Sequence, residues 1–221
     1  MERAEMDKRV RIGEALVQVV RSCGDALGNY VNILIPPLFR VIRAQSLPTI
    51  LRSSALSILA QCVETSPLSI AAWTDDILSG MLDILQLESV QALPLSRKAR
   101  EEARQQDAVK LDSTIDSKPQ ETDSKLPPLR RSALVCFALV IRSMLEGVYE
   151  GTRPAQLGDL RGKTVAVLDY LRITDSDPVV RTQAAETLSL VKQLGRAELG
   201  LDVKIGNSPF VRPALRFNHP S

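Results

Sequence analysis

The chain has few of the residues on which most active sites depend. Its only histidine, His219, stands two residues before the end, and aromatic residues make up 4% of the 221 positions. A histidine in a chain terminus is far more often solvated than catalytic. Without another histidine, the sequence offers no Ser-His or Cys-His pair for nucleophilic catalysis. We therefore predict a protein that is not an enzyme and that needs no cofactor and no metal.

Cysteine and long apolar runs are also scarce. Cys23, Cys62 and Cys136 have no CxxC spacing and no neighbouring histidine. Their odd number and helical settings favour reduced, buried thiols in a cytosolic protein over a disulfide or a metal site. No apolar run approaches the roughly 18 residues of a membrane span, and the charged start of the chain does not resemble a secretory signal. These features predict a cytoplasmic protein without a membrane span.

The chain has no excess of charge of one sign. Its 28 lysines and arginines nearly balance 26 aspartates and glutamates, which gives a net charge of +2. A nucleic-acid-binding domain is usually strongly basic, so direct binding of DNA or RNA is a disfavoured alternative. Hydrophobic residues make up 44% of the chain. Because few of them are aromatic, the core must be aliphatic, and this favours helices packed closely on helices.

One helical pattern occurs repeatedly along the chain. It is clearest in "LRSSALSILAQCVE" (51–64), "LRRSALVCFALVIR" (129–142) and "VRTQAAETLSLVKQ" (180–193), and fainter in "IGEALVQVVRSCG" (12–24). Steps of 4, 3, 1 and 3 residues place the shared positions on one stripe of an α-helix. We expect this stripe to be the buried face of each helix. Its members are Ile12, Leu16, Val19, Val20 and Cys23; Leu51, Ala55, Ile58, Leu59 and Cys62; Leu129, Ala133, Cys136, Phe137 and Val140; Val180, Ala184, Thr187, Leu188 and Val191.

Other helices are predicted between these four. The segment 27–44 contains Pro36-Pro37, which we expect to start or kink a helix rather than lie in its middle. The segment 67–88 has Ser66 as a candidate N-cap and Pro67 at its first position, and a further helix covers 155–173. The alternation predicts an all-α fold: an α-solenoid of HEAT- or armadillo-like helical hairpins over residues 2–195.

The spacing of the pattern also predicts an insert and a tail. Arg52 and Arg130 are 78 residues apart, twice the offset of 39 between Ile12 and Leu51, which raises the question of a hidden repeat. Residues 97–125 hold only six apolar residues in 29, too few to bury against neighbours. We therefore predict a flexible insert at about 92–126, with at most a short solvated helix at 97–109. Prolines in the C-terminal tail, 196–221, predict irregular structure there.

The sequence "SDPVVRTQAAETL" resembles the second helix of a HEAT repeat. In that pattern an aspartate before the helix and an arginine inside it form a ladder between neighbouring repeats. Asp177 and Arg181 match both positions, and Asp177 is also expected to cap its helix, with Pro178 in the first turn. Arg52 and Arg130 match the arginine alone. We interpret these four residues as structural elements of the repeats.

Three stretches resemble the C-terminal region of one HEAT-type family. They are "RIGEALVQVVRSCGDALGNYVNILIPPLFRVIR", "LRSSALSILAQCVE" and "MLDILQLE". The family is that of the RNA polymerase II assembly and nuclear-import factor and its animal relative, Transport and Golgi organization protein six. The resemblance implies a cytoplasmic adaptor that shuttles to the nucleus and binds RNA polymerase II subunits, with nucleoporins and coat or chaperone-complex components as further partners. It carries no short binding motif onto individual residues.

The remaining candidates for function are surface residues. A stack of helical hairpins offers an extended face lined by the second helix of each pair, and residues away from the apolar stripe are candidates for partner binding. They are Gln18, Ser57, Gln61, Glu64, Val135 and Arg142. We interpret Trp73 as a packing residue and Arg40 with Arg43 as a weak basic pair. A generic HEAT scaffold in vesicle trafficking or nucleocytoplasmic transport is the alternative to the polymerase adaptor.

Overall fold

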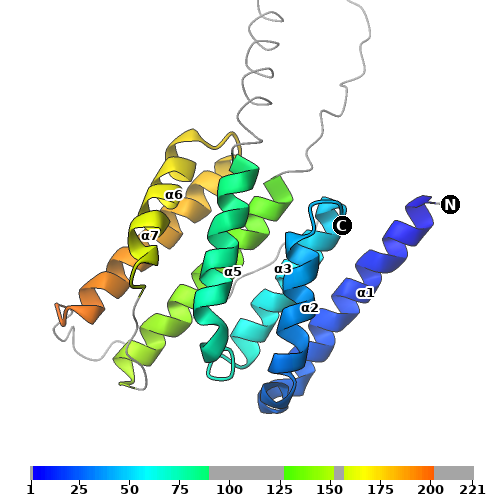
Figure 1. Cartoon of the computed structure of the whole chain (residues 1–221), viewed down its shortest axis with the longest axis horizontal. Helices are drawn as coiled ribbons and strands as arrows, with labels where there is room; N and C mark the ends of the chain where they lie inside the picture. The colour runs from blue at the N-terminus through cyan, green and yellow to red at the C-terminus, as the bar shows by residue number, and fades with distance from the viewer. Residues whose placement is uncertain (1, 90–126, 152–156, 202–221) are drawn as a thin grey trace, which may run out of the picture.

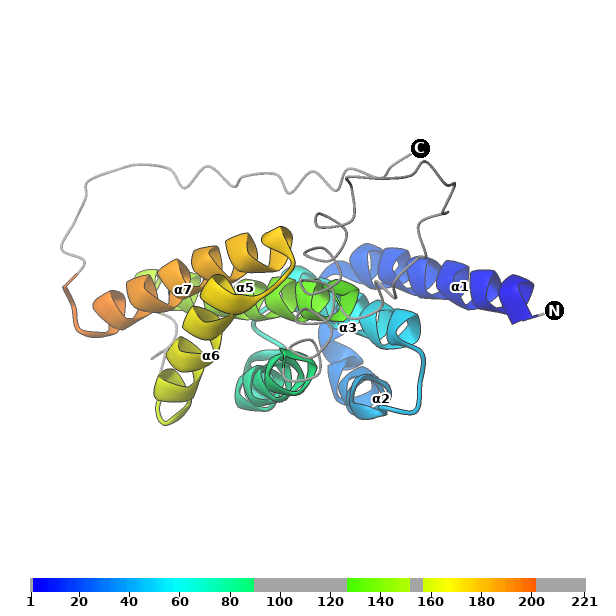
Figure 2. The same cartoon turned by 90° about the horizontal axis from the view of Figure 1, so that it is seen from above.

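The described helices lie in two layers (Figure 2). The computed structural model describes residues 2–89, 127–151 and 157–201, and all regular structure in them is helical, which confirms the predicted all-α class. The first layer holds α1 (Glu2–Cys23), α3 (Thr49–Thr65), α5 (Pro127–Tyr149) and α7 (Pro178–Glu198). The second layer holds α2 (Val31–Arg43), a helix at 74–89 and α6 (Leu160–Thr174). The short 3₁₀ helices η1 (Gly24–Asn29) and η2 (Ala71–Trp73) belong to the connections.

Helices of the first layer follow one another along the long axis of the molecule (Figure 1). Helix α1 packs on α3, α3 on α5, and α5 on α7, while α2 covers α3 and α6 covers α7. The helix at 74–89 lies between its second-layer neighbours, because Gly80 approaches Phe39 of α2 and Asp83 forms an ion pair with Lys163 of α6. The direct packing of α3 on α5 leaves no place for a hidden repeat between them.

The predicted apolar stripe forms the core in α3, α5 and α7. Every stripe residue of α5 and α7 is buried, and in α3 only Leu51 is half-buried. The position four residues into the stripe is alanine in all three helices (Ala55, Ala133 and Ala184). A small side chain there lets neighbouring helices approach closely, so the repeated alanine is explained by packing.

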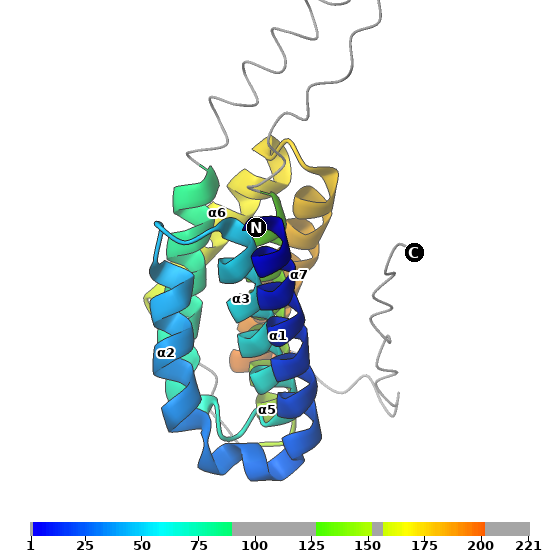
Figure 3. The same cartoon turned by 90° about the vertical axis from the view of Figure 1, so that its right-hand side faces the viewer.

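Helix α1 is the exception to this rule. Its stripe residues Ile12, Leu16 and Val19 are 51%, 46% and 56% exposed, and only Val20 of the stripe is buried. The helix contacts α3 through a different side, where Gly13 lies so close to Ser54 that a Cβ would meet the serine Cβ at 3.2 Å. Figure 3 shows α1 at the front of the molecule, and no other described helix covers that side. The prediction of burial is wrong for these three residues.

Two helix starts also differ from the prediction, and one of them is that of α6, which was predicted at 155–173 and begins at Leu160 after a turn. Residues 67–70 form a turn followed by η2, and the helix predicted at 67–88 begins only at 74. Ser66 is therefore the C-cap of α3 rather than an N-cap, and its hydroxyl donates to Ser69 Oγ at 2.8 Å. Pro67 accordingly does not occupy a first helical position. Helix α7 extends to Glu198, three residues past the predicted domain end, whereas the predicted insert and most of the tail lie outside the described residues.

The two adjacent prolines lie inside α2. Pro36 and Pro37 are preceded by five helical residues, so they do not start the helix, and the prediction that they would not lie in its middle is wrong. Each proline lacks the N–H that would bond the carbonyl four residues earlier, which affects Asn32 and Ile33. Both of these residues are exposed, and this turn of α2 faces water.

One described helix, Pro128–Tyr149 within α5, is long and apolar enough to cross a membrane by length and composition. Half of its apolar window is buried inside the protein. The helix also packs on α3 on one side and on α7 on the other. These contacts are typical of the core helix of a helical protein, which passes the same test.

Equivalent substitutions in α7 and α1 test this arrangement. Ala184→Asp places an unpaired carboxylate at a fully buried site, so we expect a loss of about 3 kcal/mol or more in the free energy of unfolding. Leu16→Asp alters the matching stripe position of α1, where water reaches the side chain, and should cost about 1 kcal/mol or less. Urea unfolding followed by circular dichroism measures both. Equal losses would show that the stripe of α1 is covered in solution.

Candidate interaction surfaces

A buried ion pair joins α5 to the end of α6. Arg130 Nε donates to Asp175 Oδ2 at 2.8 Å and its Nη2 donates to Asp175 Oδ1 at 3.0 Å. The two side chains are only 1% and 2% exposed. Two parallel hydrogen bonds between a guanidinium fork and a carboxylate fix both distance and orientation. The contact therefore joins the start of α5, the first-layer helix of one hairpin, to the turn between α6 and α7 in the next hairpin.

A second pair has the same placement one hairpin earlier. Arg52 Nη1 donates to Glu88 Oε1 at 3.0 Å, and its Nε donates to the carbonyl of Ile42 at 2.9 Å. Both side chains are buried. Arg52 and Arg130 are each the fourth residue of their helices, and each acid belongs to the following hairpin: Glu88 lies in the helix at 74–89 and Asp175 directly follows α6. The structural role predicted for these two arginines is supported by this shared contact.

The other two predicted repeat residues have different partners from those expected. Asp177 caps α7 by accepting a hydrogen bond from the Val179 N–H at 2.9 Å, as predicted. Its carboxylate also accepts a bond from Arg131 Nε at 2.7 Å, so it links α7 to α5. Arg181 donates to the carbonyl of Asp175 at 2.8 Å, within its own hairpin. Asp177 thus crosses between hairpins, whereas no ion pair of Arg181 exists among the described residues.

Most of the predicted partner-binding residues lie on the accessible side of the first layer. Gln18 of α1 and Ser57 and Glu64 of α3 are exposed. Val135 and Arg142 of α5 are half-buried. We define the outer face as Gln18, Ser57, Glu64 and Arg142, since these residues present polar groups from three successive helices.

Gln61 does not belong to the outer face. It is 7% exposed, and its Oε1 accepts a hydrogen bond from Arg21 of α1 at 3.0 Å. Its Nε2 donates to Thr65 Oγ1 at 3.1 Å. Gln61 therefore links α1 to α3, and its interpretation as a free surface residue is wrong.

A hollow of about 540 Å³ lies between α2 and the start of the helix at 74–89. Its apolar lining includes Phe39 and Trp73, and its charged lining consists of Arg40, Arg43 and Asp76. Sequence reasoning missed this site because Trp73 was interpreted as packing and the two arginines as a weak basic pair. The signal that could have found it is the combination of the chain's only tryptophan with two arginines spaced one helical turn apart. Helix α3 separates them in the sequence.

The three cysteines are free thiols, and the predicted burial is found for Cys62 and Cys136 but not for Cys23. Burial raises the pKa of Cys62 to about 11 and that of Cys136 to about 12, with a smaller contribution from a neighbouring thiol in each case. Cys23 is half-buried. Within the described ranges, no group of three or more histidine, cysteine or acidic side chains could hold a metal ion.

The buried pair and an exposed pair allow a matched test. Asp175→Asn leaves the guanidinium of Arg130 buried without a counter-charge, so we expect a loss of about 3 kcal/mol or more in the free energy of unfolding. Asp169→Asn removes a carboxylate that pairs with Arg172 on the exposed surface of α6, and should cost less than about 1 kcal/mol. Urea unfolding of both variants gives the comparison. A small loss in both would mean that the buried pair does not hold the hairpins together.

Thiol labelling tests the burial of the cysteines. With a thiolate-specific disulfide reagent at neutral pH, we expect one fast equivalent, at Cys23. Cys62 and Cys136 should react only after denaturation, because a raised pKa and burial both suppress the reactive thiolate. The variant Cys23→Ser should abolish the fast phase and leave the slow one unchanged. A fast phase that persists in this variant would contradict the packing described above.

Comparison of the chain with protein-family models, with curated proteins and with solved structures gives no match. The contacts and surfaces described above, together with the resemblance of the repeated segments, are therefore the basis for a functional proposal.

Proposed function

We propose that this chain is a non-enzymatic protein-binding scaffold, built as a HEAT-like α-solenoid, that binds partners on the outer face. The single observation that best supports this is the repeated arginine–acid contact between consecutive hairpins. A unit that recurs with the same contact to its neighbour is typical of solenoids, in which each repeat touches only the next. Such proteins act through an extended surface.

The outer face suits a protein partner. It carries a glutamine, a serine, a glutamate and an arginine from three neighbouring helices, so it has no strong charge of either sign. A mixed polar surface of this kind favours hydrogen bonding to protein side chains over the phosphate contacts that dominate nucleic-acid binding.

The exposed stripe of α1 supports a further detail of the solenoid. Ile12, Leu16 and Val19 match positions that neighbouring helices cover in α3, α5 and α7. A contiguous apolar strip on a helix surface is a typical interaction site. We infer that another helical repeat, presented by a partner or by a longer form of the protein, packs against this strip.

The partner we propose is RNA polymerase II, through one or more of its subunits, during cytoplasmic assembly and delivery to the nucleus. This part of the proposal depends on the resemblance of the three stretches quoted above, between residues 11 and 88, to the assembly and import factor family. Nucleoporins and coat or chaperone-complex components are the further partners that the resemblance implies.

A binding experiment tests both the partner and the face. The immobilised full chain is presented with purified RNA polymerase II subunits, and we expect at least one to be retained. Ser57→Arg with Glu64→Arg adds bulk and positive charge to the outer face and should weaken retention by about tenfold or more. Asp75→Arg with Gln86→Arg changes the net charge equally on exposed sites of the helix at 74–89 and should have little effect.

Each outcome decides a different part of the proposal. If no subunit is retained, the polymerase partner is wrong. Retention that both double variants lower equally would show that the outer face is not the binding surface. If proximity labelling in cells is dominated by coat or cargo proteins, the alternative of a generic trafficking or transport scaffold is favoured instead.

A further inference from the structure

The hollow between α2 and the helix at 74–89 has a fixed aromatic floor. Phe39 is 7% exposed, and the neighbouring helix approaches its ring at Gly80, where a Cβ would lie 3.1 Å from Phe39 Cε1. No larger residue fits at that point without moving the ring. The glycine therefore lets the two helices close on Phe39 and hold it in place.

The wall of the hollow is formed by Trp73. Its indole N–H donates to Asn32 Oδ1 of α2 at 3.1 Å, which sets the orientation of the ring. The side chain is half-buried, so part of the indole remains accessible from the hollow. A large ring that is held by a hydrogen bond and still exposed is a typical anchor for a partner's apolar side chain.

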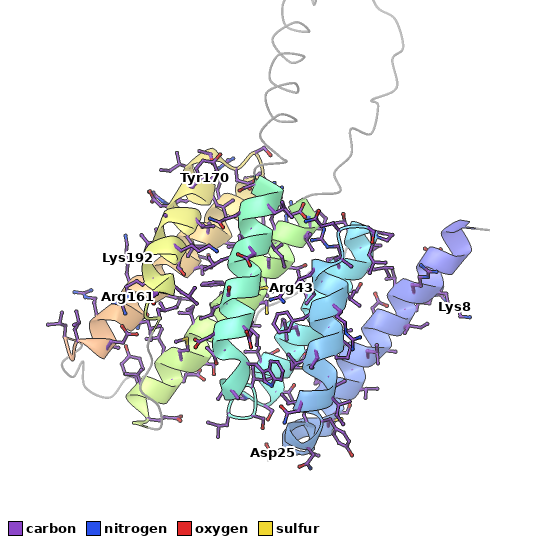
Figure 4. All side chains as sticks on the ribbon, viewed as in Figure 1. Lys8, Asp25, Arg43, Arg161, Tyr170 and Lys192 are labelled. Atoms are coloured by element: carbon purple, nitrogen blue, oxygen red, sulfur yellow. The ribbon has the colours of Figure 1, made fainter. Side chains whose placement is uncertain are left out.

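Two arginines stand at the rim. The guanidinium carbon of Arg43 lies 5.1 Å from the centre of the Phe39 ring and over its face, a cation–π contact that holds the charge beside the floor. Arg40 precedes it by one helical turn and is also exposed. Neither arginine forms an ion pair within the part of the chain that the structure describes. Figure 4 shows Arg43 between α2 and the helix at 74–89.

The hollow therefore carries a net positive charge, located at Arg40 and Arg43. Asp76 is the acidic residue of the lining, so the charged lining residues sum to one excess positive charge. Guanidinium groups bind carboxylates in a two-pronged geometry, and they do so more strongly than they bind neutral acceptors. The aromatic floor and wall provide apolar surface next to these donors.

We propose that this hollow binds an extended segment of a partner protein in which a carboxylate side chain stands next to a large apolar one. The apolar side chain rests on the accessible part of the Trp73 indole, beside the buried Phe39 ring that Arg43 covers, and the carboxylate pairs with Arg40 and Arg43. The hollow lies on the second layer, whereas the outer face lies on the first. A partner segment can therefore bind in the hollow whether or not the outer face is occupied.

The only tryptophan of the chain reports directly on this site. The probe is a library of octapeptides, each with two Asp or Glu residues flanking one Phe, Leu, Ile or Met in a Ser/Gly background. Selective excitation of Trp73 in the full chain should show a saturable change in emission. A matched library with Asn and Gln in place of the acids should bind about tenfold more weakly, because the charged hydrogen bonds are lost.

Charge reversal separates this site from general attraction of acidic peptides. Arg40→Glu with Arg43→Glu should abolish the emission change. Lys192→Glu with Arg196→Glu removes the same charge from exposed positions of α7 and should preserve it. Figure 4 places Lys192 at the α6–α7 end of the molecule, away from Arg43. If the reversal lowers the thermal stability, Arg40→Gln with Arg43→Gln replaces it.

Three results would overturn the proposal. The first is an unchanged Trp73 emission with the acidic library at millimolar concentration. The second is equal binding of the acidic and amide libraries, and the third is an equal loss of binding in the hollow variant and the α7 variant. Failure of polymerase subunits to bind the outer face would leave these readouts unaffected, so the two proposals fail separately.

Discussion

The buried pairing of an arginine in one hairpin with an acid in the next determines how the helices of this chain stack. Aliphatic stripes supply most of the favourable free energy through burial, but the hydrophobic effect is non-directional and does not by itself fix the register of one helix along another. A guanidinium buried beside a carboxylate does not tolerate such a shift, because an uncompensated charge in the interior is strongly unfavourable. Arg130 with Asp175 therefore selects one register for α5 against α6 and α7, and Arg52 with Glu88 does the same one hairpin earlier.

Features with a local cause could be predicted from the sequence. The all-α class and the buried face of α5 and α7 follow from a helical period that is visible within about a dozen residues. The cap at Asp177 depends only on the residues next to it. Glu88 was not predicted as a partner of Arg52, since the two are separated by 36 residues and no local pattern links them. The HEAT pattern predicts the acid just before the helix that carries the arginine, whereas both buried acids belong to the following hairpin.

The errors have a common physical origin. An apolar period identifies the apolar face of a helix. It does not show whether another element of the fold covers that face. Leu16 and Ala184 occupy the same position of the pattern, yet one is 46% exposed and the other is fully buried. Gln61 is the opposite case, because a polar residue away from the stripe is buried by Arg21 of the adjacent helix. Both outcomes depend on neighbours that are distant in sequence.

Two pairs of arginines in this chain have different uses, and they lie at opposite ends of their helices. Arg52 and Arg130 lie in the first turn of their helices, where the N-terminal end of the helix dipole disfavours a positive charge and a buried acid compensates it. Arg40 and Arg43 lie in the last turn of α2, where the negative end of the dipole stabilises a cation without a counter-ion. A positive charge at that end of a helix can stay unpaired at little cost. This explains how the hollow beside Trp73 keeps two exposed guanidinium groups available for a ligand while the other two arginines remain committed to the stack.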